Sequence, residues 1–207
     1  MTPRRTGRPP SISLEAILAA GLEIGLADLT IAAVAERLRV TRTSVHRYVG
    51  SRHDLETLVG EHLVVSAPVV ADTGQPLEAY LLEFATALAG HIRAHPGLAA
   101  YYARGFPRTA RSARVVEDFD RTLVDRGIAP LAAARLAAAV ANHAIALTAF
   151  AMLDEPAGAP AALDPERMPI LAAVRRAAAE AGPDAETWDM WSLRGAVHGL
   201  VALTREA

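Results

Sequence analysis

The stretch that decides the fold is residues 29–55, LTIAAVAERLRVTRTSVHRYVGSRHDL. Thr30 and Thr41 each precede a short segment with apolar side chains at helical spacing, and threonine is a preferred N-cap residue. Only Arg39 and Val40 separate the two segments, a connection of helix-turn-helix length. The pattern therefore predicts two short helices joined by a tight turn.

The second of these helices, predicted over residues 42–49, has the composition of a recognition helix. Its first turn carries small polar and basic side chains, which reach base edges when such a helix enters the major groove. Ala35 in the preceding helix is small enough to let the two helices cross closely. Helical hairpins with this apolar pattern also occur without DNA, so a purely structural hairpin is the alternative. The candidate DNA contacts in this helix are Arg42, Thr43, Ser44, His46 and Arg47.

Charge is distributed unevenly along the chain. Residues 1–53 hold eight arginines against four acidic residues, whereas the whole chain has a net charge of −2. A basic N-terminal block on an otherwise acidic protein is the electrostatic footprint of a phosphate-binding module. The block begins with an arm that carries Arg4, Arg5 and Arg8.

The remainder of the chain also predicts helices. Apolar residues recur at helical spacing, and no stretch alternates with the period of two that a half-buried strand requires. The expected fold class is therefore all-α. We expect an N-terminal three-helix helix-turn-helix domain over residues 1–55 and a larger helical domain over residues 56–207, with about nine or ten helices in all. In the second domain the predicted helices are residues 76–94, 98–102, 111–126, 130–153, 169–181 and 184–204.

Composition excludes several classes of protein. Hydrophobic residues make up 52% and charged residues 21% of 207 residues, which is enough apolar material for a buried core. The absence of cysteine excludes disulfide scaffolds, cysteine-based zinc sites and thiol nucleophiles. We identify no secretory signal and no apolar run near the roughly 18–20 residues of a membrane span. A cytoplasmic protein with no membrane partner is expected.

The decisive segment resembles the DNA-binding domain of the tetracycline-repressor (TetR) family of bacterial regulators. The family pattern joins Leu-Thr, a short helix with a central Ala, Val-Ser/Thr, a helix that ends near Tyr-Arg-Tyr-Phe, and Ser-Lys-x-x-Leu. The corresponding residues here are Leu29-Thr30, Ala35, Val40-Thr41, His46-Arg47-Tyr48-Val49 and Ser51-Arg52 with Leu55. The departures are Arg39 in place of the usual Gly, His46 in place of Tyr, Val49 in place of Phe and Arg52 in place of Lys.

The resemblance implies roles for individual side chains. Thr30 and Tyr48 would contact phosphate, and Arg52 would clamp the DNA backbone from the start of the fourth helix. Arg42 is the best candidate for bidentate readout of a guanine, and the basic arm resembles family arms that lie on phosphate or in a minor groove. A homodimer would place its recognition helices in two successive major grooves of a pseudo-palindromic operator.

From Pro76 onward the chain resembles, more loosely, the ligand-binding domain of the tetracycline-repressor subgroup. There a drug–magnesium complex is held partly by a histidine of the short sixth helix, whereas this chain has Tyr102 or its neighbours and no histidine at that place, which disfavours that effector. A mostly apolar cavity is expected instead, although each aromatic side chain would serve equally as plain core. Its candidate lining is Phe84, Leu88, Tyr102, Phe106, Phe119, Leu123 and Phe150, with His91, Asn142 and His143 as polar contacts.

The helices at residues 131–153 and 184–204 are expected to form the dimer interface. The first is rich in alanine, and the second places Gly195 and Gly199 on one face, with Ala196 and Ala202 close by. Small residues let helices approach closely, and TetR-family dimers are four-helix bundles made from the corresponding helices. Alanine is abundant throughout the chain, so the two glycines are the stronger cue.

Nothing in the sequence predicts an enzyme, a cofactor or a metal site. There is no phosphate-cradling glycine loop, no G-x-S-x-G elbow and no H-E-x-x-H motif. His91 and His95 have the spacing of metal ligands on one helix face, but two ligands are too few for a site.

The expected function is that of a homodimeric transcriptional regulator, a repressor that a small, largely apolar effector of unknown identity releases from double-stranded operator DNA. The alternative is a DNA-binding dimer whose C-terminal domain serves only dimerisation or protein interaction and takes no effector.

Overall fold

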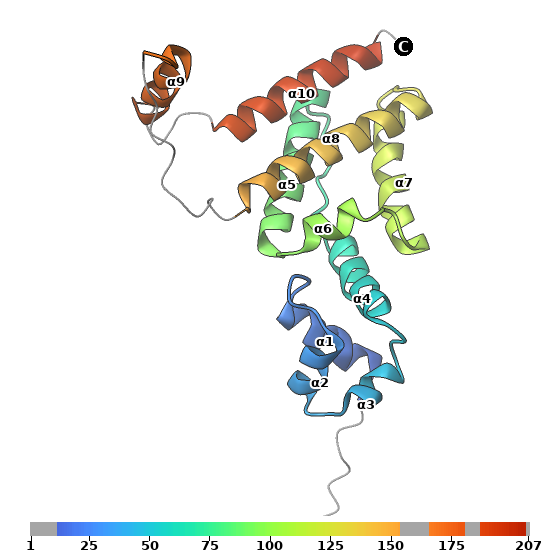
Figure 1. Ribbon diagram of the computed structural model, residues 1–207. Coiled ribbons are helices and arrows are strands. Elements are labelled where there is room, and N and C mark those ends of the chain that lie inside the picture. Colours follow the sequence, from blue (N-terminus) through green and yellow to red (C-terminus); the bar gives the residue numbers. More distant parts are fainter. Residues whose placement is uncertain (1–11, 154–165, 181–186, 206–207) are drawn as a thin grey trace, which may run out of the picture.

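The computed structural model describes residues 12–153, 166–180 and 187–205. Within these ranges the chain forms helices and no strands, which confirms the all-α expectation (Figure 1). The helices are α1 (Leu14–Ile24), α2 (Ile31–Leu38), α3 (Arg42–His46), α4 (Arg52–Val65), α5 (Leu77–Ala94), α6 (Leu98–Ala103), α7 (Ala110–Asp125), α8 (Pro130–Ala151), α9 (Pro169–Glu180) and α10 (Trp188–Arg205).

Helices α1 to α3 form a small N-terminal unit, which we call the head. The side chains of Ser13, Thr30 and Thr41 accept hydrogen bonds from the backbone of the first turns of α1, α2 and α3, which confirms the predicted N-caps Thr30 and Thr41. The three helices enclose an apolar core to which α4 also contributes. Its fully buried members include Ile17, Leu29, Val34, Val45 and Leu55.

Helix α4 connects the head to the remaining helices, which we call the body (Figure 1). It packs against α1 on the head side and against α6 and α7 on the body side. A glycine on each side of these contacts, one on α4 and one on α1, makes the close packing possible. A Cβ on Gly60 would lie 2.3 Å from the Tyr101 ring of α6, and a Cβ on Gly21 of α1 would lie 2.5 Å from Val59.

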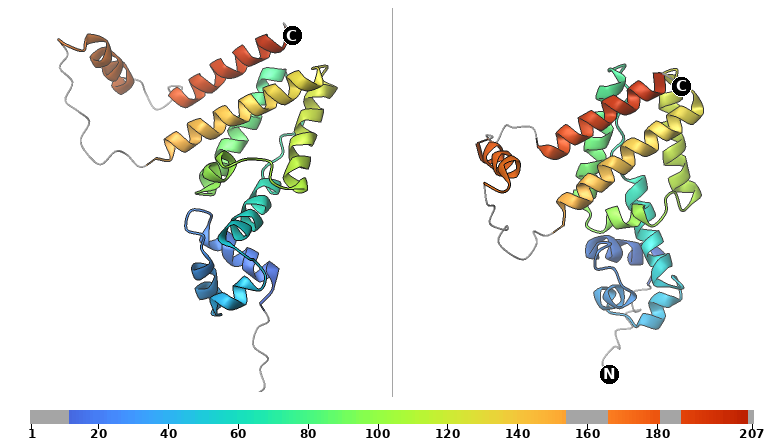
Figure 2. Two further views of the ribbon diagram at one scale, coloured as in Figure 1. Left: turned by 45° about the vertical axis from the view of Figure 1, so that its right-hand side comes forward. Right: turned by 45° about the horizontal axis from the view of Figure 1, so that its top comes forward.

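In the body, α5, α8 and α10 pack on one another, and α7 packs on α8. Helices α8 and α10 lie side by side and run in opposite directions (Figures 1 and 2). Helix α9 stands away from the other helices in all views (Figures 1 and 2). Its apolar side chains are correspondingly exposed, at Ile170, Leu171 and Val174.

Helix α8 corrects one expectation from the sequence. With 22 residues it is long and apolar enough, by length and composition only, to cross a membrane. The expectation that no apolar run comes near the length of a membrane span was therefore wrong. The helix packs against α5, α6, α7 and α10 in the manner of a core helix. Only 33% of its apolar window is buried, which leaves a broad apolar face uncovered in one chain.

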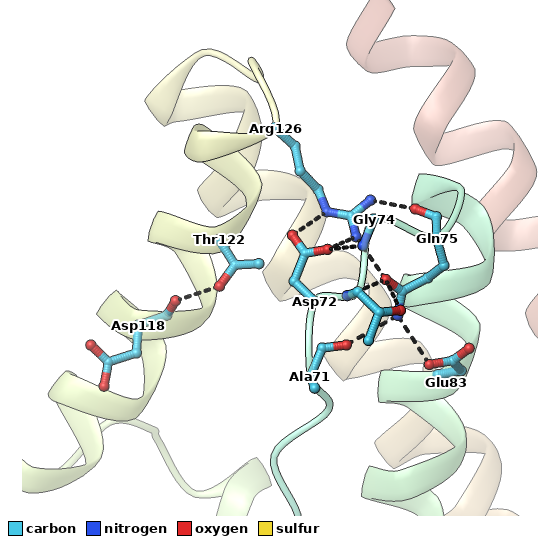
Figure 3. A network of polar contacts seen from close by, with 9 residues as sticks. Ala71, Asp72, Gly74, Gln75, Glu83, Asp118, Thr122 and Arg126 are labelled. Atoms are coloured by element: carbon cyan, nitrogen blue, oxygen red, sulfur yellow. Dashed lines mark hydrogen bonds and ion pairs between the residues drawn. The ribbon is translucent and has the colours of Figure 1, made fainter.

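The loop between α4 and α5 is tied to the end of α7 by Arg126 (Figure 3). The Arg126 guanidinium donates from Nε to Asp72 at 2.9 Å and from Nη1 to the Gln75 carbonyl at 2.8 Å. It also lies 4.6 Å from the centre of the Tyr80 ring on α5. One arginine therefore joins α7, the loop and α5.

Two helix boundaries differ from the predicted ones by more than two residues. Helix α3 ends at His46 and not at residue 49, because the chain turns tightly there and the Tyr48 amide bonds the Val45 carbonyl three residues back. Helix α10 begins at Trp188 within the described part of the chain, and residues 181–186 lie outside it.

Candidate functional site

The turn between α2 and α3 is built around Arg39. This residue has φ 55° and ψ 44°, the left-handed conformation, and its amide bonds the carbonyl oxygens at the end of α2. The Val40 amide bonds the Ala35 carbonyl at 2.9 Å and completes the cap. The conformation is the one that glycine adopts most easily, so the departure from the family pattern at Arg39 leaves the turn geometry intact.

Helix α3 is anchored by one side chain and exposes the others. Val45 is fully buried in the head core. Ser44 is half-buried and its hydroxyl lies 2.9 Å from the Thr41 hydroxyl, so it is partly engaged in the cap. The remaining predicted contacts are exposed together on this helix and the turn after it, namely Arg42, Thr43, His46 and Arg47.

Three other predicted DNA contacts are already engaged within the chain. The Tyr48 hydroxyl donates to the Ile12 carbonyl at 2.6 Å, which uses its single proton and ties the turn after α3 to the chain just before α1. The Thr30 hydroxyl oxygen accepts from the Ala33 amide at 3.0 Å. Arg52 donates from Nε to Glu56 at 2.8 Å. Arg4, Arg5 and Arg8 lie outside the described residues.

The predicted effector contacts do not gather at one cavity. Phe84 of α5 stacks on Phe119 of α7 with ring centroids 4.0 Å apart, while Leu88 and Leu123 belong to the core. Phe150 is 75% exposed. The aromatic residues between α5 and α7 thus fill the interior by packing on one another, which is the alternative that the sequence left open.

Two predicted polar contacts are engaged between helices. His91 is buried and donates from Nε2 to the Leu63 carbonyl of α4 at 2.9 Å, and burial lowers the pKa of its ring. His143 of α8 lies 3.2 Å from the Ser192 hydroxyl of α10. Each histidine therefore connects a pair of helices. His95, the other half of the predicted pair, donates from Nδ1 to the His91 carbonyl at 2.9 Å.

A groove of about 600 Å³ lies between α6 and the second half of α8. Of the predicted contacts, Tyr102 and Asn142 line it. The Tyr102 ring meets Phe106 edge-on at 5.0 Å, and burial raises the pKa of the Tyr102 hydroxyl to about 12, so the phenol stays neutral at physiological pH. The lining residues that the sequence analysis missed are Pro96, Gly97, Ala99, Ala100, Ala103, Ile145, Ala146, Ala149, Met152 and Leu153.

The missed residues carry a signal that could have been used. On α8, Asn142, Ile145, Ala146 and Ala149 follow one another at three- and four-residue spacing and so share a helix face. The sequence predicts that this alanine-rich helix packs in a dimer, whereas the small side chains of Ala146 and Ala149 leave a hollow beside α6. Within the described ranges, no group of three or more histidine, aspartate or glutamate side chains is arranged to hold a metal ion.

Glu61 of α4 is a buried carboxylate with 6% exposure. The Tyr101 hydroxyl of α6 donates to it at 2.9 Å, and the Thr109 hydroxyl at the start of α7 donates to its other oxygen. Burial and the neighbouring carboxylate raise the pKa of the Tyr101 hydroxyl. Arg108 lies 4.0 Å over the Tyr101 ring and bonds the Tyr101 carbonyl. The body side of α4 is thus fastened to α6 and α7 by polar contacts.

Comparison with known proteins gives matches among solved structures alone. Neither a protein-family model nor a curated protein matches the sequence. Apo ActR from Streptomyces coelicolor superposes with a TM-score of 0.76 at 20% identity, over 95% of this chain and 98% of that one. A possible TetR family transcriptional regulator from the same organism gives 0.70 at 25% identity, over 92% and 97%.

A third structure is a TetR variant from Acinetobacter baumannii AYE in complex with minocycline. It gives a TM-score of 0.66 at 16% identity, over 93% of this chain and 98% of that one. ActR in complex with actinorhodin matches as well, with a TM-score of 0.73 at 19% identity over 93% and 98%. The similarity covers head and body together, so the chain has, over nearly its whole length, the fold of the TetR-family transcriptional regulators.

Proposed function

We propose that this chain is a homodimeric, ligand-responsive transcriptional regulator of the TetR family. It acts as a repressor that binds a pseudo-palindromic operator through α3 of each protomer and leaves it when a small, largely apolar effector enters the groove between α6 and α8. One observation carries the proposal: an exposed polar and basic recognition helix and a separate apolar groove of about 600 Å³ occur in the same chain.

The exposed part of α3 supports DNA binding. Arg42 stands at the first position of the helix, where a side chain reaches base edges in the major groove. Arg47 and His46 follow toward the C-terminal end, close to where phosphates would flank the helix. Because Tyr48 donates its proton to the Ile12 carbonyl, we assign it the role of holding the chain just before α1 near the end of α3.

The groove supports binding of a small molecule. It has room for a compound of several rings, its walls are mostly alanine and aliphatic side chains, and Tyr102 and Asn142 supply hydrogen-bonding groups. Actinorhodin and minocycline, the ligands of two similar structures, are multi-ring molecules and therefore useful probes. Helix α6, LAAYYA, has no histidine, so we expect minocycline with magnesium to be a poor effector.

Exposed apolar side chains on α8 and α10 support a dimer. Phe150 is 75% and Trp191 62% exposed, and Leu131 and Leu203 are open to solvent as well. Side chains of this size are expected to be covered in a stable protein. Both helices carry such side chains, which supports the four-helix interface expected from the sequence.

The deciding experiment is selection of binding sites from a random duplex library, followed by fluorescence anisotropy at physiological salt with random competitor. We expect a pseudo-palindromic site with half-site centres about 34–36 Å apart, one helical turn of DNA. If the selection recovers no preferred sequence, the proposal of a sequence-specific regulator is contradicted.

The effector is tested on the selected duplex with a panel of planar aromatic compounds that includes actinorhodin. A compound that binds the groove should dissociate the protein from DNA. Compounds that bind the protein and leave the affinity for the duplex unchanged would refute release by an effector and favour a body that serves dimerisation alone.

A further inference from the structure

The head touches the body at a second place besides α4. The Ala27 amide, in the loop between α1 and α2, donates to the Pro96 carbonyl in the turn between α5 and α6 at 3.2 Å. Gly97, the next residue of that turn, has φ 92°. A Cβ on Gly97 would lie 2.6 Å from the Ala27 nitrogen and 2.8 Å from the Leu26 carbonyl carbon. The two loops are therefore in direct backbone contact, with no space for a side chain between them.

The same turn is part of the ligand groove. Pro96 and Gly97 line the groove, followed by Ala99, Ala100 and Tyr102 of α6. On the opposite side, Gly97 also borders a small cavity of about 200 Å³ whose walls include Leu26 and Ala27 of the head. This two-residue turn therefore borders the groove and also contacts the head.

Helix α6 is also fastened to α4 at its far end. Arg104, which caps α6, forms an ion pair with Glu56 at 3.2 Å, and Glu56 in turn pairs with Arg52 at 2.8 Å. The hydrogen bond from Tyr101 to Glu61 holds the middle of α6 to the same helix. A displacement of α6 must therefore be shared with α4, whereas a displacement of the preceding turn acts on the α1–α2 loop directly.

We infer that Pro96 and Gly97 are positioning residues that transmit occupation of the groove to the head by pressing on Ala27. The inference rests on the proposed function, in which a ligand in the groove weakens DNA binding. Packed backbone contacts do not compress, so a ligand that shifts the turn displaces the α1–α2 loop. Helices α2 and α3 follow, since α1, α2 and α3 pack on one another in sequence.

The first test is Gly97→Ala, with Gly127→Ala as the matched control. Both glycines have positive φ, at 92° and 90°, so both substitutions carry similar backbone strain. A Cβ at Gly127 meets nothing within 4 Å, whereas one at Gly97 meets the head. We expect Gly97→Ala to lower affinity for the selected duplex about tenfold or more relative to Gly127→Ala. Equal affinities in the two variants would overturn the inference.

The second test leaves the turn unchanged and fills the groove covalently. The chain has no cysteine, so Ala146→Cys provides a unique thiol in the groove wall. Alkylation with monobromobimane forms a thioether there and releases bromide. Ala113→Cys, exposed on α7 and away from the groove, is labelled in the same way as the control.

Hydrogen exchange of the Ala27 amide, followed by NMR, reports on the contact without any DNA. We expect the bimane at Ala146→Cys to change the exchange rate of this amide and the bimane at Ala113→Cys to leave it unchanged. An unchanged rate in both proteins refutes the transmission through the turn. Site selection that yields no operator would refute the proposed regulator. A change in the exchange rate of the Ala27 amide on labelling of Ala146→Cys would still support the transmission from the groove to the head.

Discussion

Arg39 holds the turn between α2 and α3 in a backbone conformation that disfavours a β-carbon. The left-handed region costs a non-glycine residue about 1–2 kcal/mol, while glycine costs roughly 0.4–1 kcal/mol through the entropy of the unfolded chain. Since the Arg39 side chain is exposed, we expect Arg39→Gly to raise the free energy of unfolding by up to about 1 kcal/mol. Urea unfolding measures it, and a clear loss of stability would contradict this account of the turn.

Arg42 and Arg52 are expected to contact different parts of the DNA, Arg42 a base edge and Arg52 the phosphate backbone. Arg42 is exposed at the start of α3, so Arg42→Ala should relax the preference at one base pair of each half-site by about 1–3 kcal/mol. Arg52 is held by Glu56 at the start of α4, so Arg52→Ala should weaken binding to all duplexes alike and reduce the dependence on salt. Anisotropy with single-base variants of the selected site separates the two effects. Uniform losses for both proteins would remove Arg42 from base readout.

The buried ring of His91 makes stability depend on pH. Burial lowers its pKa below the ordinary value of 6.5, so the folded protein binds fewer protons than the unfolded chain as the pH falls through that region. The contribution of the buried His91 ring to the free energy of unfolding is therefore complete above the ordinary pKa and is lost progressively below it. We expect the free energy of unfolding to fall between pH 7.5 and pH 5.5 and this slope to be reduced in His91→Gln, with the same change at exposed His53 as the control. If the slope of the free energy of unfolding against pH is the same in His91→Gln, groups other than His91 cause the pH dependence.

At the scale of elements, the link between α7 and the α4–α5 loop is electrostatic. The hydrogen bond from Arg126 holds the pKa of Asp72 below its ordinary value of 3.8 (Figure 3). The stabilisation is therefore present above that value and is lost as the pH falls below it. We expect Asp72→Asn to lower the urea midpoint at pH 7 and to have a smaller effect at pH 3, where protonation of the unfolded chain has already removed part of the stabilisation.

The neighbouring ion pair on α7 is a suitable comparison for that link. Arg121 and Glu117 face solvent four residues apart, and exposed pairs of this kind contribute little. Glu117→Gln should leave the midpoint unchanged at both pH values. If Asp72→Asn and Glu117→Gln behave alike, the loop is held by its apolar contacts and by the bond from Arg126 to the Gln75 carbonyl.

At the scale of the whole molecule, the uncovered faces of α8 and α10 predict the quaternary structure. In the part of the chain that the structure describes, no atom lies within 4 Å of a Cβ built on Gly195 of α10, so we expect a side chain added there to meet a partner. We expect Gly195→Leu to shift the dimer toward monomer in sedimentation velocity. Gly90→Leu on α5, which is equally open and also mid-helix, controls for the change in helix propensity. A dimer that resists Gly195→Leu would place the interface on another surface.

Much of the head could be predicted from the sequence, because its determinants are local. An N-cap threonine and apolar residues at helical spacing act over one or two turns. Both α2 and its N-cap Thr30 are found where the sequence predicts them. The end of α3 was predicted wrongly, because tertiary contacts determine where so short a helix ends. Tyr48 illustrates the reason: its partner, Ile12, is 36 residues away.

The sequence by itself determined the helical class, the caps and the basic, polar character of α3, all of which depend on residues within a few positions of one another. Only the tertiary structure decided which faces meet. It packed Phe84 against Phe119 as core, opened the groove along Tyr102 and Asn142, and brought Gly97 against Ala27. Helical periodicity says that a face is apolar, but close packing with distant segments decides whether that face becomes core, groove or interface.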